Sequence, residues 1–83
     1  MKYEVKPIKS HLSKYLDKYD LSLKWEKAKN FLANDLSHPS LNFEKIILKS
    51  TIFYSFRLDK KYRGICILSK GKIEVILFTN HYK

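Results

Sequence analysis

Cysteine and glycine are scarce in this chain of 83 residues, and each scarcity excludes a class of protein. The one cysteine, Cys66, cannot form an internal disulfide, which excludes a small disulfide-stabilised scaffold. Two glycines are too few for a glycine-rich phosphate-binding loop, and no histidine and cysteine residues are clustered as in a zinc site. The sequence therefore predicts neither a bound metal nor any other cofactor.

Long apolar runs are missing as well. No stretch approaches the roughly 20 apolar residues that cross a bilayer, and residues 1–7 lack the apolar segment of a signal peptide. We therefore expect a cytoplasmic protein without a membrane span. With 45% hydrophobic residues, the chain should fold as one domain over residues 1–83. Its core should be thin, because so short a chain buries only about 60–65% of its unfolded surface.

Acidic residues are few, since 8 aspartates and glutamates face 17 lysines and arginines, which gives a net charge of +9 at pH 7. Such a charge favours RNA, DNA or an acidic protein as partner, although a lysine-coated surface without a partner is the alternative. Arginine is rarer still, because only Arg57 and Arg63 occur among the basic residues. The planar fork of arginine grips phosphate or carboxylate through two parallel bonds, so we expect these two positions to be functional.

Hydrophobic periodicity predicts an α+β fold with a small, mostly antiparallel sheet. Residues 2–6 alternate as in a short strand, and two amphipathic helices follow. The expected caps are Ser10 for the first helix and Asp20 or Ser22 for the second, which must end before Pro39. The period then becomes two and predicts a meander of three or four strands, over residues 44–48, 52–58, 62–68 and 73–78.

Two helices can cover only one face of such a sheet, and we expect them to do so through Trp25, Phe31 and Leu32. The chain has too few residues left to cover the other face. The sequence therefore predicts a partly open, basic sheet face into which Arg57 or Arg63 projects.

Cleavage of RNA without a metal needs a group that takes the 2′-hydroxyl proton, a cation at the phosphate and an acid for the leaving oxygen. The candidates are Glu44, Arg63 with Arg57, and His81 with the adjacent Tyr82. Each has a purely structural alternative: a solvated strand glutamate, arginines that pair with carboxylates or stack on rings, and an ordinary chain end.

Several stretches carry a resemblance to a known family. They are the His-Pro-Ser-Leu segment 38–41, the strand 54–58 with the sequence Tyr-Ser-Phe-Arg-Leu, and the pair Tyr62-Arg63. Together with the order of elements, they resemble the RelE/ParE superfamily of type II toxin–antitoxin systems, and the final Asn80-His81-Tyr82 resembles its YoeB branch. The resemblance implies a RelE-like fold and an endoribonuclease (mRNA interferase). Such a toxin cuts mRNA in the ribosomal A site without a metal and is neutralised by a cognate antitoxin.

The resemblance also implies roles for single residues. Glu44 matches the general base, and Arg63 matches the arginine that stabilises the phosphate in the transition state. His81 matches the general acid, with Tyr82 beside it, and Arg57 matches a neighbouring basic position that helps to hold phosphate.

One departure from the YoeB pattern adds two further candidates. The YoeB branch has proline after the glutamate, whereas this chain has Lys45. Since other branches use lysines here, Lys45 and Lys49 are RNA-binding candidates and leave the identity of the general base open. A ParE-type toxin that binds gyrase, a catalytically inactive nucleic-acid-binding relative and assembly as a homodimer also stay open at this point.

Overall fold

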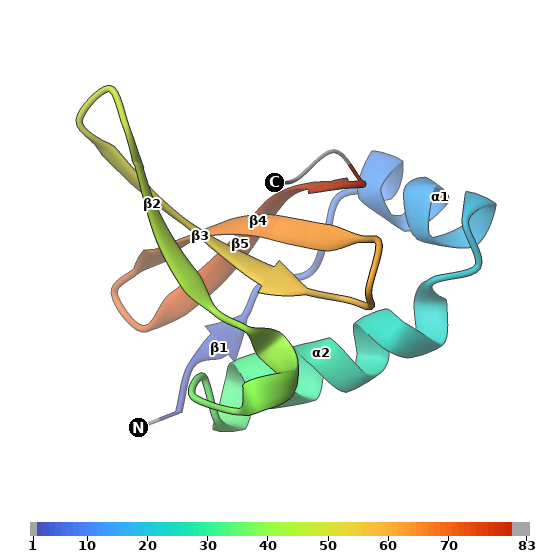
Figure 1. Cartoon of the computed structure of the whole chain (residues 1–83), viewed down its shortest axis with the longest axis horizontal. Coiled ribbons are helices and arrows are strands. Elements are labelled where there is room, and N and C mark those ends of the chain that lie inside the picture. The colour runs from blue at the N-terminus through green and yellow to red at the C-terminus, as the bar shows by residue number, and fades with distance from the viewer. Residues whose placement is uncertain (1, 81–83) are drawn as a thin grey trace.

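The computed structural model describes residues 2–80 and contains a five-stranded sheet with two α-helices. The elements are β1 (Glu4–Val5), α1 (Ser10–Lys18), α2 (Ser22–Asn34), the 3₁₀ helix η1 (Pro39–Leu41), β2 (Glu44–Leu48), β3 (Thr51–Arg57), β4 (Arg63–Ser69) and β5 (Lys72–Thr79). The strand order is β1-β5-β4-β3-β2 (Figure 1). Only β1 and β5 run parallel, so the predicted α+β class with a mostly antiparallel sheet is confirmed.

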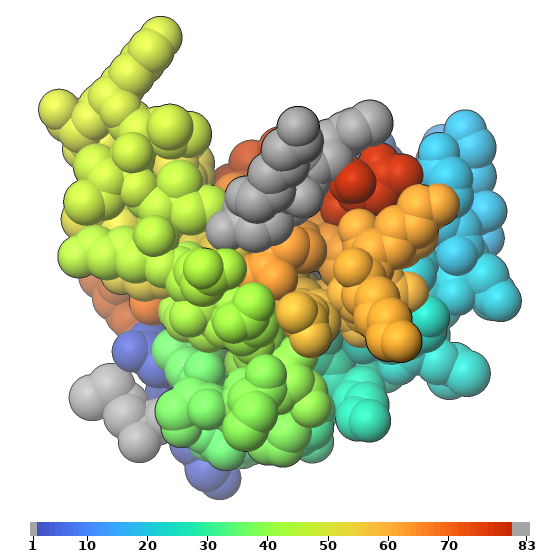
Figure 2. Space-filling view, viewed as in Figure 1, coloured from blue at the N-terminus to red at the C-terminus, as the bar shows by residue number. Residues whose placement is uncertain are grey.

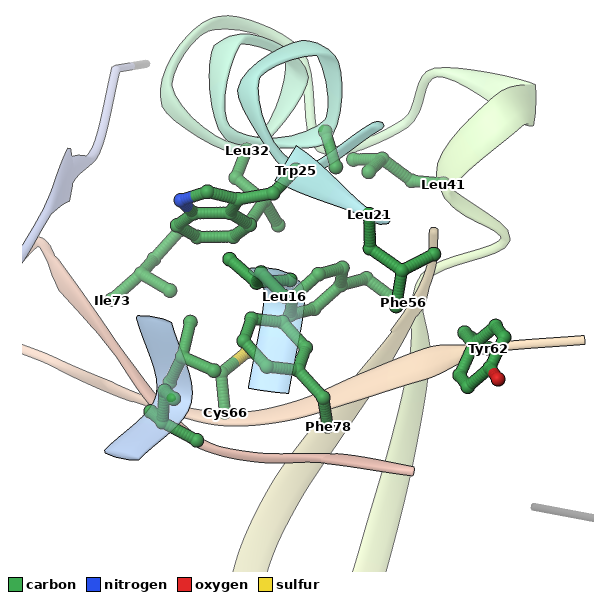
Figure 3. Close-up of a cluster of buried hydrophobic side chains, with 13 residues drawn as sticks. Leu16, Leu21, Trp25, Leu32, Leu41, Phe56, Tyr62, Cys66, Ile73 and Phe78 are labelled. Atoms are coloured by element: carbon green, nitrogen blue, oxygen red, sulfur yellow. The ribbon is translucent and has the colours of Figure 1, made fainter. Parts of the chain in front are cut away.

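The hydrophobic core lies between the helices and one face of the sheet (Figure 3). The ring of Trp25 on α2 packs against Phe56 of β3 and Phe78 of β5, with centroids 6.1 and 5.6 Å apart. Leu32 and Ile73 are fully buried in the same cluster. Burying each such side chain stabilises the fold by about 1.5–3 kcal/mol, so this contact fixes which face of the sheet the helices cover.

Gly64 makes room for the central aromatic ring of this core. It lies opposite Phe56 in the register between β3 and β4. A Cβ atom at Gly64 would lie only 2.2 Å from Cζ of that ring. The absence of a side chain at Gly64 therefore leaves the space that the ring of Phe56 fills between β4 and Trp25 of α2.

The predicted helix caps are wrong, because the residues between the helices complete the end of α1. Ser10 and Ser22 are the first residues of their helices, and neither helix has a side-chain cap at its start. Asp20 takes a left-handed conformation with φ of 57°, and the Leu21 N–H donates to the Leu16 carbonyl at 2.8 Å. This is the Schellman arrangement of a helix end, usually built with glycine. Leu21 then becomes the N-cap residue of α2.

Two hairpins use turns with two left-handed residues. Lys70 and Gly71 have φ of 52° and 77° and connect β4 to β5 in a tight turn. Lys49 and Ser50 have φ of 47° and 68° and connect β2 to β3 without any glycine. Such turns match the twist of the strands that they join and place them in direct register.

The hairpin of β2 and β3 projects from the body of the molecule (Figures 1 and 2). Among the strands of residues 2–80, β2 lies at the edge of the sheet and pairs only with β3. The outer half of the hairpin exposes three aliphatic side chains, Ile47, Leu48 and Ile52, to 64%, 58% and 45%. The hairpin therefore extends the sheet beyond the area that the helices cover.

Candidate functional site

The face of the sheet opposite the helices carries both arginines, as predicted. Phe56 points to the helices, so the next residue, Arg57, and its direct cross-strand partner Arg63 face the other way. Glu44 pairs with Ser55 on that same face. The strand register therefore gathers Glu44, Ser55, Arg57 and Arg63 into one cluster, which we call the arginine site.

Arg63 is the buried centre of the arginine site, with only 7% of its surface exposed. Three oxygens surround its Nη2 atom. Nη2 donates to the Asn42 carbonyl at 2.9 Å, to Ser55 Oγ at 2.8 Å and to Glu44 Oε1 at 3.3 Å. A buried guanidinium keeps its charge and needs such partners, so these contacts fix the orientation of the cation.

Two of these partners were not predicted from the sequence. Asn42 ends η1 in a left-handed conformation with φ of 43°, which aims its carbonyl at Arg63. Asparagine is one of the few residues that adopt this conformation readily. Ser55 is completely buried. The signal that could have found it is a small polar side chain between Tyr54 and Phe56 on the face that carries arginine.

Glu44 adds a carboxylate at the accessible side of the arginine site. Its side chain is 48% exposed, whereas that of Arg63 is 9% exposed. The carboxylate is therefore open to solvent on one side while it contacts the buried guanidinium on the other. Chemically, the pair can hold an anion at the guanidinium and accept a proton from a nearby hydroxyl.

Arg57 adds a second cation directly across the strands from Arg63. It is exposed, and among residues 2–80 it has neither a hydrogen bond nor a salt bridge through its side chain. Like charges in a cross-strand pair repel each other. An anion bound between the two arginines would relieve that repulsion.

The remaining predicted residues lie elsewhere. Lys45 pairs with Tyr54, which places it on the opposite face of β2 from Glu44, and Lys49 lies in the hairpin turn. The structure brings neither lysine to the arginine site, and their roles stay predictions. His81 and Tyr82 lie outside the described residues.

Within residues 2–80, no group of three or more histidine, cysteine or acidic side chains is arranged to hold a metal. In the same part of the chain, no helix is long and apolar enough to cross a membrane.

Comparison with known proteins supports the fold. No family model and no curated protein matches the sequence. The structure of the YoeB dimer from Staphylococcus aureus matches with a TM-score of 0.66 and 21% identity, over 99% of this chain and 98% of that chain. A chain of the archaeal RelE–RelB complex from Pyrococcus horikoshii OT3 matches with a TM-score of 0.67 and 19% identity, over 100% and 99%. The predicted RelE-like fold is therefore confirmed.

Proposed function

We propose that this RelE-like chain is the toxin of a type II toxin–antitoxin system and cuts mRNA in the ribosomal A site without a metal. The observation that carries the proposal is the buried guanidinium of Arg63, held by Asn42, Ser55 and Glu44 on the open face of the sheet. Burying a cation and surrounding it with oxygens is costly, and a protein that needs only a basic surface has no use for it. A preorganised cation at a reacting phosphate does have that use.

The proposed reaction is the attack of the 2′-hydroxyl on the adjacent phosphorus. Glu44 takes the hydroxyl proton, the 2′-oxygen bonds to phosphorus, and the bond from phosphorus to the 5′-oxygen breaks. Arg63 and Arg57 stabilise the charge that develops on the phosphate oxygens. His81, with Tyr82 beside it, protonates the leaving 5′-oxygen. The products are a 2′,3′-cyclic phosphate and a 5′-hydroxyl.

The same proposal includes a cognate antitoxin as partner. The net charge of +9 supports an acidic segment of that protein as the cover of the open face. One matching structure is a RelE–RelB complex and the other is a YoeB dimer, which supports a test for both an antitoxin and a homodimer. We further propose that the chain acts as one domain in the cytoplasm and uses no cofactor.

Mapping of mRNA 5′ ends after induced expression tests this function. Wild-type protein should produce cuts within translated frames, and Arg63→Ala should lower their frequency by about 10²–10³-fold. Arg63→Lys should also be impaired, because lysine lacks the planar fork. Lys14→Ala, an exposed change on α1, is the matched control and should cut normally. Intact mRNA with DNA-damage signalling would instead indicate a gyrase-directed toxin, and no effect of either kind would indicate an inactive relative.

The general base is tested by two neighbouring substitutions with opposite expectations. Glu44→Gln keeps the shape of the side chain and removes the base, so cleavage should fall by about 10²–10⁴-fold. Lys45→Ala should have little effect, because this side chain lies on the other face of β2. The reverse result would transfer the role to the lysine.

The end of the chain is tested by truncation after Asn80. The shortened protein should fold, keep its free energy of unfolding within about 1 kcal/mol and still bind the antitoxin, because chain ends seldom carry much stability. It should nevertheless lose mRNA cleavage, and His81→Gln should reproduce most of the loss. A truncated chain that stays toxic at equal expression would exclude the terminal pair from catalysis.

A further inference from the structure

A groove of about 370 Å³ opens beside the arginine site, between α2, η1 and the segment that follows β3. Its floor is apolar and consists of Ala28, Phe31, Leu41 and Leu58. Leu41 and Ala28 are buried in the core, and the ring of Phe31 is stacked on that of His38 at 3.7 Å. The floor is therefore continuous with the hydrophobic core of the protein.

The rim of this groove is strongly basic. It carries Lys24, Lys27, Arg57 and Lys60, against the single carboxylate of Asp59. That carboxylate forms a salt bridge with Lys24, whose Nζ lies 2.7 Å from Oδ2 of Asp59. Within residues 2–80, no carboxylate forms a salt bridge with the other three cations. The rim thus keeps three uncompensated positive charges around an apolar surface.

Arg57 connects this groove to the arginine site. It lines the groove and is also the direct cross-strand partner of Arg63. Residues in such a pair have Cβ atoms only about 4.5–5.5 Å apart. Arg57 therefore belongs to both the groove and the arginine site.

We propose that this groove holds a nucleotide of single-stranded RNA next to the scissile phosphate, with its phosphate on the basic rim and its base on the apolar floor. Cationic rims combined with aromatic and apolar platforms are how proteins bind single strands without reading their sequence. This inference rests on the proposed RNA cleavage, because it assumes that the scissile phosphate lies on Arg63 and that the RNA strand continues past Arg57 into the groove. It assigns a positioning role to Lys27, Lys60 and Phe31.

The test measures binding of a fluorescent, single-stranded 2′-O-methyl hexanucleotide, which has no 2′-hydroxyl and is not cleaved. The double variant Lys27→Ala/Lys60→Ala should weaken binding at least about tenfold at low salt. It should also reduce the slope of log K against log salt by about 1.4, because each contact to a single strand contributes about 0.7. The matched control is Lys2→Ala/Lys14→Ala, which removes the same charge from exposed positions outside the groove and should change the slope much less.

The floor is tested with the same probe carrying one abasic position at a time. At one position, loss of the base should weaken binding to the wild-type protein but not to Phe31→Ala, since stacking on the floor is then already lost. Groove variants that bind the probe like the control pair would overturn the proposal, as would a wild-type protein without measurable binding. A glutamate-rich peptide with leucine anchors provides a second comparison. If this peptide binds the groove variants more weakly than wild type while the oligonucleotide binds both equally, the groove is a protein-docking site and the proposal is overturned. Cuts mapped in cellular mRNA report on the proposed function separately, so the two can fail independently.

Discussion

Replacing Ser55 by alanine tests whether the protein holds its buried arginine in the way the structure indicates. The change removes the hydroxyl that accepts from Nη2 of Arg63 at 2.8 Å. Ser55 is 0% exposed and Arg63 is 7% exposed, so bulk water cannot replace the lost acceptor. A hydrogen bond to a charged group contributes about 1.5–3 kcal/mol. Because the Asn42 carbonyl and Glu44 remain, we expect the lower end of that range.

A loss of about 1.5 kcal/mol corresponds to a fall in Tm of about 6–12 °C for a domain of this size. Urea and thermal unfolding, followed by circular dichroism, measure it. Ser69→Ala, at the exposed end of β4, is the control and should stay within about 0.5 kcal/mol. In an Arg63→Met background, Ser55→Ala should have almost no effect. An equal loss in both backgrounds would show that the hydroxyl does not act through Arg63.

Four further predictions concern the rest of the fold. Gly64→Ala should destabilise by about 3 kcal/mol or prevent folding, because its Cβ would overlap a core ring, and an unchanged urea midpoint would refute this. Asp20→Gly should raise the free energy of unfolding by up to about 1 kcal/mol, because φ is 57° there, and a lower Tm would contradict it. Burial alone would raise the pKa of Asp59, but hydrogen bonds from Lys24 and from two backbone N–H groups lower it. The ionised Asp59 carboxylate therefore stabilises the fold fully above its unfolded pKa of about 3.9, and this stabilisation is lost as pH falls through the lower folded pKa. The Tm values of wild type and Asp59→Asn should accordingly converge below about pH 4. Burial raises the pKa of Cys66 to about 12, so a thiol reagent at pH 8 should label it only in urea.

Most elements of this fold could be predicted because alternation and helical spacing record which side chains are buried. The open face predicted to carry Arg57 or Arg63 carries both arginines, whereas Phe56, next to Arg57 in β3, is buried against the helices. The caps failed for a local reason. Aspartate is a residue type that often caps the start of a helix. Asp20, however, takes a left-handed conformation that belongs to the end of the preceding helix α1.

The arginine site could be predicted only in part. The family resemblance assigned both Glu44 and Arg63 to the catalytic site, and in the structure Oε1 of Glu44 lies 3.3 Å from Nη2 of Arg63. Ser55 and the Asn42 carbonyl were missed, because their role depends on strand register and on the direction of one backbone carbonyl. The basic groove was missed for a similar reason. Its cations come from α2, from β3 and from the segment after β3, and only tertiary packing brings them together.

Because of the projecting hairpin, we expect the solubility of this protein to depend on salt. Its edge strand β2 has no proline or bulge and exposes Ile47 and Leu48, next to the exposed Ile52 of β3. An edge strand of this kind favours pairing with other copies. Mutual repulsion between molecules of charge +9 opposes such pairing. Raising the ionic strength from 0.1 to 1 M shortens the screening length from about 10 to about 3 Å and removes most of that repulsion. Concentrated stocks should therefore stay clear in dilute buffer and become turbid in strong salt, and Ile47→Lys should keep them clear in both.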